Sequence, residues 1–297
     1  MTILVGFAPD RDDQSGLELA ATLARSGGLD LLVATVFPAP WPTPVAGHTD
    51  REFEAWAQER AARGIEQARR LLADHCPEIP AQVLAEEGRS IPAALLHVAE
   101  RHGVSMIVLG SGHDGAYGHV NLSSTADRLL HSSHVPVAVA TRGYRAGEHG
   151  RVSRATCAFR GDAISQATLL RTAELCRENG ASLRIATFAV RGRTMYPPEV
   201  GTHAEDMVLA RWVEQARTRQ EEAMERLRAK GVLPERTEAV VVSARTWGHA
   251  IDRLVWDRDE VLVIGSSSSA SLVSRLFLGS SAAKIVRHSA VPVVVVP

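Results

Sequence analysis

The sequence predicts a doubly wound α/β protein whose fold is repeated twice within one chain of 297 residues. Its apolar runs, such as LLVATV at 31–36 and MIVLG at 106–110, are continuous rather than alternating. Continuous runs are typical of parallel strands that helices cover on both faces. The second observation is internal similarity, because HVPVAVA in the middle of the chain and AVPVVVV near its end place Pro136 and Pro292 at matching positions.

Each copy alternates strands with helices. In the first copy we expect strands at 2–7, 30–37, 81–86, 104–109 and 136–140, separated by helices near 13–26, 50–75, 91–102 and 124–133. The second copy repeats this pattern with an offset that changes only in a loop, where VRGRTMYPPEVGTH is longer than its counterpart. We therefore expect domains at 1–143 and 152–297, joined by the charged linker RGYRAGEHGR at 142–151.

The composition excludes several classes of function. Lys and Arg number 33 against 34 Asp and Glu, so no overall positive charge exists to hold nucleic acid or an anionic membrane. The start of the chain has no signal-like segment, and runs such as VPVVVV are too short to cross a bilayer, so we expect a cytoplasmic protein. The three cysteines lack CxxC spacing, which favours buried thiols over a disulfide or a zinc site.

Four short stretches resemble a tandem universal stress protein: ILVG at 3–6, GS at 265–266, LGSSA at 278–282 and HSAVPVVVV at 288–296. For each copy the resemblance implies a five-stranded, mainly parallel sheet of order 3-2-1-4-5 with helices on both faces. It also implies that the strands at 136–140 and 292–296 pair antiparallel and form an internal pseudo-dimer. A further homodimer of the whole chain stays open.

The family's phosphate loop has the form G-x2-G-x9-G-[S/T], and in nucleotide-binding members it wraps the phosphates of ATP. In the second copy its four positions hold Gly265, Ser269 (after one inserted residue), Gly279 and Ser280. A glycine at a strand end lets the backbone approach a phosphate, and the following helix start offers free N–H groups. The additional candidates are two hydroxyls and one charge, from Ser266, Ser281 and Arg275. A solvated serine-rich loop capped by Ser280 remains the alternative.

The first copy departs further from the loop pattern. Gly110 and Ser124 are kept, but His113 and Ser123 replace the second and third glycines. A side chain at a position that needs positive φ costs about 1–2 kcal/mol per residue. The extra glycines at 112, 115 and 118 leave another path for the chain open.

The base-binding side also departs from the family. Nucleotide-binding members carry an aspartate after the first strand that accepts a hydrogen bond from adenine, whereas Ala8 and Arg160 stand here. The main chain at Val36 and Phe188, where the second strands end, remains available for a base. We therefore expect weak binding of ATP or a similar phosphate-bearing ligand in the second copy, and a mainly structural first copy.

Three functions follow from these observations. The first is a stress-response regulatory protein that binds an adenine nucleotide weakly, mainly in its C-terminal domain. The alternative is a nucleotide-free scaffold that acts through dimerisation. The third, very slow ATP hydrolysis, rests on the family resemblance alone, because no motif positions a general base. The sequence predicts no metal.

Overall fold

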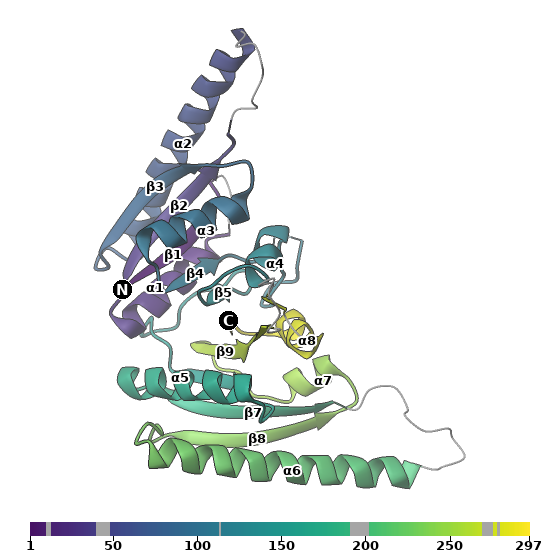
Figure 1. Ribbon diagram of the computed structural model, residues 1–297. Coiled ribbons are helices and arrows are strands. Elements are labelled where there is room, and N and C mark those ends of the chain that lie inside the picture. The colour runs from purple at the N-terminus through teal and green to yellow at the C-terminus, as the bar shows by residue number, and fades with distance from the viewer. Residues whose placement is uncertain (10–12, 40–47, 113, 191–201, 269–275, 278–279) are drawn as a thin grey trace.

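The structure is a computed structural model that describes residues 1–9, 13–39, 48–112, 114–190, 202–268, 276–277 and 280–297. Ten of the described strands form one continuous sheet in the order β3-β2-β1-β4-β5-β12-β9-β6-β7-β8 (Figure 1). The first copy supplies β1 (Thr2–Phe7), β2 (Asp30–Phe37), β3 (Ala81–Glu87), β4 (Met106–Leu109) and β5 (Val137–Val139). The second copy supplies β6 (Arg154–Ala158), β7 (Ser182–Val190), β8 (Thr237–Ala244), β9 (Glu260–Gly265) and β12 (Val293–Val296). Each half therefore has the order 3-2-1-4-5, which confirms the predicted fold.

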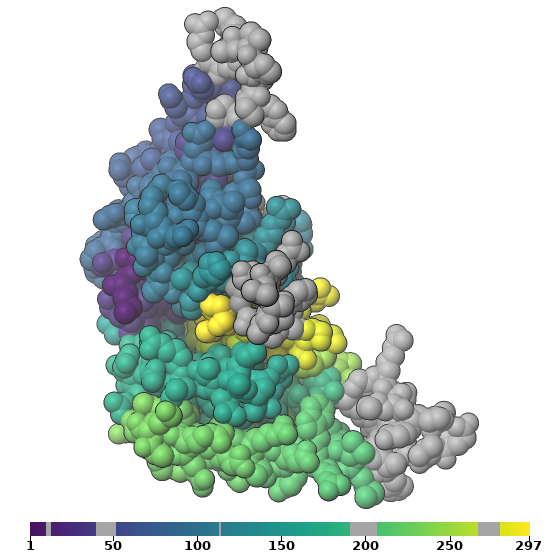
Figure 2. All heavy atoms as spheres, viewed as in Figure 1, coloured from purple at the N-terminus to yellow at the C-terminus, as the bar shows by residue number. Residues whose placement is uncertain are grey.

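Helices cover both faces of the sheet. On one face lie α1 (Ser15–Gly27), α2 (His48–His75), α5 (Ala163–Asn179) and α6 (Thr202–Ala229), and on the other α3 (Ile91–His102), α4 (Ser124–Leu130), α7 (Trp247–Asp252) and α8 (Ser280–His288). Because successive strand residues point to opposite faces, Ile3 and Val5 lie in one core and Leu4 lies in the other. Both cores contain residues of both copies, so the two halves form one body (Figure 2).

The two halves meet where β5 and β12 pair antiparallel. Val139 lies opposite Val293, and Val137 lies opposite Val295. The carbonyls of the preceding prolines accept hydrogen bonds from the neighbouring parallel strands. Pro136 accepts from Ile107 N in β4 and Pro292 from Leu262 N in β9, each over 2.9 Å. A proline at this point costs no sheet hydrogen bond, because its missing N–H lies before the strand begins. The predicted pairing of the two segments is confirmed.

The linker between the copies is packed rather than free. Tyr144 is 6% exposed, and its hydroxyl lies 3.4 Å from Thr22 Oγ1 in α1. Burial raises the pKa of this phenol above its ordinary value. Further along, Gly147 N donates to the Asp259 carboxylate over 2.6 Å, and Val152 N donates to Ser26 Oγ over 2.8 Å. These bonds attach the linker to both copies.

The ends of the elements differ from prediction where serine side chains compete for the backbone. The helix expected at 124–133 ends at Leu130 as α4. Beyond it, Ser133 Oγ donates to the Val135 carbonyl over 2.7 Å and also accepts from Val135 N. Such local bonds offer the backbone an alternative to continuing the helix.

All three cysteines are free and buried, as expected for core thiols. Among the described helices, none combines the length and the apolarity that a bilayer span requires. In the same part of the chain, no group of three or more His, Cys, Asp or Glu side chains could hold a metal ion.

Candidate functional site

Both copies have a cavity at the carboxyl ends of their central strands. The sheet order reverses between β1 and β4 in the first copy and between β6 and β9 in the second. In doubly wound sheets this reversal opens a crevice in which ligands bind. The two cavities differ greatly in size, at about 1140 Å³ in the first copy and about 160 Å³ in the second.

The first cavity has one apolar side and one polar side. The apolar side comes from the ends of β1 and β2 and from α3, and includes Ala8, Val36, Ile91 and Leu95. The polar side comes from the loop of residues 110–124 and from the linker that follows β5. Pockets for organic ligands commonly combine apolar walls with a few placed polar groups.

Hydrogen bonds close the loop of residues 110–124 upon itself. Gly112 N donates to the Asn121 carbonyl over 2.7 Å, and Asn121 N donates to Ser111 Oγ over 2.6 Å. A Cβ atom at Gly115 would lie 2.5 Å from Asn121 Cβ, so only glycine fits there. Glycines other than those of the family pattern therefore define the path of this loop.

The glycines that end β4 and β9 have different surroundings. A Cβ atom at Gly110 would have Gly16 N as its nearest neighbour, at 3.5 Å, which is an ordinary contact. A Cβ atom at Gly265 would lie 2.4 Å from Thr168 Oγ1 and 2.8 Å from Ile164 Cγ2. Packing therefore accounts for the glycine at 265, whereas it does not require one at 110.

Two linker arginines line the first cavity, and the sequence reasoning missed them. Arg142 lies over the ring of Tyr117, with 4.6 Å between the guanidinium carbon and the ring centroid, and donates to the Gly115 carbonyl. Its backbone is bonded to the loop as well, since Arg142 N donates to the His119 carbonyl over 3.0 Å. Arg145 is exposed, and its one hydrogen bond within the described residues goes to the Tyr144 carbonyl over 3.1 Å. The sequence did contain a signal for these arginines, because the linker directly follows β5, the strand that lies beside β4.

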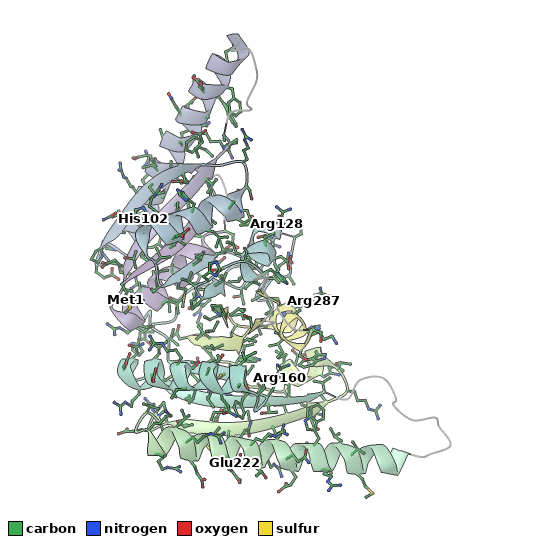
Figure 3. The ribbon with its side chains drawn as sticks, viewed as in Figure 1. Met1, His102, Arg128, Arg160, Glu222 and Arg287 are labelled. Carbon is green, nitrogen blue, oxygen red and sulfur yellow. The ribbon has the colours of Figure 1, made fainter. Side chains whose placement is uncertain are left out.

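Larger side chains line the second cavity than the first. Arg160 (Figure 3) stands where the first copy has Ala8, Phe188 where it has Val36, and Trp247 where it has Ile91. The rings of Phe188 and Trp247 lie 6.4 Å apart, centroid to centroid. Arg160 is ion-paired with Asp162 over 2.5 Å.

The predicted site residues are divided among three places. Val36, Gly110 and Ser124 line the first cavity, and Phe188 and Ser281 line the second. At the end of β9 and the start of α8 lie Gly265, Ser266 and Ser280. Ser266 is 2% exposed, and its hydroxyl has no hydrogen-bond partner within the described residues. Four positions of the predicted loops lie outside the described residues: His113, Ser269, Arg275 and Gly279.

Comparison with known proteins agrees with this architecture. The model of the universal stress protein family matches residues 1–141 and again residues 153–297. A universal stress protein of Mycobacterium tuberculosis is 41% identical over 297 residues, covering 100% of both chains, and one of Mycobacterium bovis shows the same values.

Among solved structures, a universal stress protein from Archaeoglobus fulgidus has a TM-score of 0.64 at 16% identity, covering 99% of this chain and 97% of its own. A Pseudomonas aeruginosa structure has a TM-score of 0.59 at 17% identity, covering 99% and 92%. At these identities the structural likeness shows the fold alone. Because the family model matches twice and the curated relatives align over the full length, the chain belongs to the universal stress protein family, with two family domains in tandem.

Proposed function

We propose that this chain is a stress-response protein that binds an adenine nucleotide, or a similar phosphate-bearing nucleotide, in the cavity of its first copy. The observation that carries the proposal is a cavity of about 1140 Å³ that brings Val36, Gly110 and Ser124 together with two linker arginines. Pockets for organic ligands usually measure about 300–1,000 Å³, so this one has room for a whole nucleotide.

Gly110, Ser123 and Ser124 form the part of the cavity lining that suits a phosphate chain. Gly110 has no side chain to cover its backbone, although the surrounding packing would allow one. The Ser123 hydroxyl caps α4 by accepting a hydrogen bond from Ala126 N over 3.2 Å. Ser124 is exposed, and its hydroxyl has no hydrogen-bond partner within the described residues. The Ser124 hydroxyl is therefore available to a ligand.

Charge at the polar side also favours an anion. The charged residues among the described lining comprise three arginines and two aspartates: Arg60, Arg142, Arg145, Asp13 and Asp114. Arginine guanidinium groups bind phosphate through several N–H donors at once. Affinity should therefore fall from ATP to ADP to AMP, as the number of phosphates falls.

The apolar side can hold a base through apolar contacts, without a side-chain hydrogen bond from Ala8, Val36, Ile91 or Leu95 that would distinguish adenine from other bases. Ala8 gives no side-chain acceptor for the exocyclic amine of adenine, so contact with Val36, Ile91 and Leu95 is what retains the ring. Loss of a charged hydrogen bond costs about 1.5–3 kcal/mol, or about ten- to a hundredfold in affinity. We therefore propose weak binding.

The expectation from sequence placed the nucleotide mainly in the second copy. That preference remains a prediction, since Ser269, Arg275 and Gly279 lie outside the described residues. The described residues support the first copy, because its cavity of about 1140 Å³ includes the strand-end glycine and the helix-start serine, whereas the second cavity of about 160 Å³ includes neither Gly265 nor Ser280.

Calorimetric titration of the full chain with ATP, ADP and AMP tests the proposal. Arg145→Gln removes a charge from the cavity lining and should weaken ATP binding by about three- to tenfold. Arg151→Gln is the matched control, because Arg151 belongs to the same linker, is exposed and does not line the cavity. Equal losses in the two variants would attribute the effect to net charge and reject the site. A native protein that gives no heat with any of the three nucleotides at millimolar concentration would reject nucleotide binding and leave the scaffold function.

A further inference from the structure

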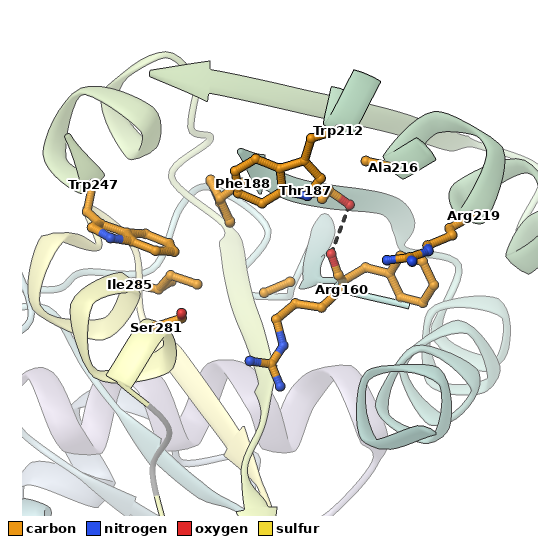
Figure 4. Close-up of a pocket in the computed structure, with 11 residues that line it drawn as sticks. Arg160, Thr187, Phe188, Trp212, Ala216, Arg219, Trp247, Ser281 and Ile285 are labelled. Carbon is orange, nitrogen blue, oxygen red and sulfur yellow. Dashed lines mark hydrogen bonds between the residues drawn. The ribbon is translucent and has the colours of Figure 1, made fainter. Parts of the chain in front are cut away.

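The second cavity differs from the first in chemistry as well as in size. Four aromatic side chains line it: Phe159 directly after β6, Phe188 from β7, Trp212 from α6 and Trp247 from α7. Figure 4 shows Trp247 and Ile285 on one side, Phe188 and Trp212 in the middle and Arg219 on the opposite side, while the Arg160 side chain extends away from the rings of Phe188 and Trp212. The lining thus combines flat apolar rings with two guanidinium groups.

The size of this pocket limits what it can hold. Its volume is about 160 Å³. A protein cavity of about 150 Å³ with apolar walls is known to take up benzene, so one six-membered ring fits here and a nucleoside does not. Aromatic walls favour a flat ring, because offset-stacked and edge-to-face contacts between rings add to the burial of apolar surface.

The charges limit the ligand further. Arg160 gives one N–H to Asp162, which leaves other donors of its guanidinium group for a ligand. Arg219 packs its side chain against Gly161, where a Cβ atom would lie 2.8 Å from Arg219 Cδ. Arg219 is exposed, and within the described part of the chain its guanidinium group has neither an ion pair nor a hydrogen bond. No carboxylate is among the described residues that line the pocket, and the nearby Asp162 carboxylate is paired with Arg160.

We propose that the second copy binds a small aromatic carboxylate, with its single ring between Phe188, Trp212 and Trp247 and its carboxylate against Arg219 and Arg160. This is a different ligand class in a different domain from the nucleotide of the first copy. The two proposals are therefore independent, and each can fail alone.

Nuclear magnetic resonance of the indole N–H groups tests the proposal directly. The chain has five tryptophans, and substitution of each pocket tryptophan by phenylalanine assigns its signal. Benzoate should shift the signals of Trp212 and Trp247. The Trp256 signal should not move, because its Nε1 donates to the Ile251 carbonyl over 2.9 Å and its ring does not line the pocket. Benzyl alcohol, which has the same ring without the charge, should bind at least about tenfold more weakly.

Two arginine variants on α6 separate the pocket from the net charge of the protein. Arg219→Met should weaken benzoate binding by about tenfold and leave benzyl alcohol unchanged. Arg217→Met is the matched control, since Arg217 lies two residues away on the same helix, is 62% exposed in its side chain and pairs with Glu214. It should leave the affinity for benzoate unchanged.

Several outcomes would overturn the proposal. The first is that the Trp212 and Trp247 signals do not move at saturating benzoate. The second is that benzoate and benzyl alcohol bind with equal affinity, and the third is that the two arginine variants lose affinity for benzoate equally. Displacement of benzoate by ATP would also overturn it, because the pocket would then belong to the nucleotide. The observed signals belong to residues of the second copy, so failure here does not affect the proposal for the first copy.

Discussion

Replacing Gly265 by alanine should destabilise the second copy, whereas the same change at Gly110 should not. The new Cβ atom would lie 2.4 Å from Thr168 Oγ1 and 2.8 Å from Ile164 Cγ2, well inside van der Waals contact. At Gly110 the nearest atom is 3.5 Å away. The two glycines end equivalent strands, so the pair compares the same mutation in two packing environments.

The neighbours of Gly265 cannot move aside cheaply. Thr168 is 4% exposed, and its hydroxyl donates to the Ile164 carbonyl over 2.9 Å within α5. A threonine side chain in a helix has few χ1 rotamers, so turning Oγ1 away breaks this bond or moves the methyl group into the contact. Overpacking of this kind costs about 1–3 kcal/mol. For a domain of this size the transition temperature should fall by about 2–4 °C for each kcal/mol.

Scanning calorimetry of the native protein and the two alanine variants measures this effect. Gly265→Ala should lower the transition temperature by several degrees, and Gly110→Ala should leave it within about one degree. Adding Thr168→Ala to Gly265→Ala removes the closest clash and should recover part of the loss, which a double-mutant cycle records as coupling. If Gly265→Ala is as stable as the native protein, or if Gly110→Ala loses as much, the distinction between the two glycines is wrong.

Two further predictions concern titratable groups. Burial raises the pKa of Cys157 and Cys176 to about 12, and it also raises that of Cys76. At about pH 8 all three thiols should therefore react with a thiol reagent only after unfolding, and rapid reaction in the native protein would contradict their burial. At Asp162, burial alone would raise the pKa, but the hydrogen bonds from Ser165 and the charge of Arg160 outweigh it and lower the pKa below its ordinary value. Its contribution to stability is thus complete above about pH 4 and is lost as the pH falls through the lowered pKa. Asp162→Asn should flatten the acid side of the thermal stability curve, and an unchanged curve would refute this account.

The strands and their order could be predicted because they depend on features that the sequence displays directly. Continuous apolar runs such as residues 31–36 indicate strands buried on both faces, and those residues lie within β2. The pairing of β5 with β12 followed from the family resemblance together with the repeat. The ends of short elements were harder to predict, as at Leu130, because single hydrogen bonds from serine side chains decide them.

The cavities could not be predicted from the sequence, because they depend on volume and on contacts distant in sequence. The loop pattern selected the loop of the second copy, which begins at Gly265, as the better preserved, yet Thr168, nearly a hundred residues earlier, accounts for that glycine through packing. Likewise, no spacing rule connects Arg142 to the loop at 110–124, although the fold brings their backbones into hydrogen-bond contact. Substitution of Ala8, Val36 and Ile91 by larger residues in the second copy was visible in sequence, but its effect on the cavity requires all three to be placed together.

The tandem arrangement bonds the loop and the linker of the first cavity to the second copy. The loop of residues 110–124 is bonded to the second copy, because Val120 N donates to the Ser289 carbonyl over 3.3 Å. Ser289 is fully buried and directly follows α8, the helix that carries Ser281 and Ile285 of the second cavity. The linker that lines the first cavity is bonded in turn to Asp259, which directly precedes β9 of the second copy. The bond to Ser289 thus connects the loop with the helix that lines the second cavity, whereas the bond to Asp259 lies at the amino end of β9, away from that cavity. For that reason the intact tandem chain, rather than either half, is the unit in which both ligands must be measured.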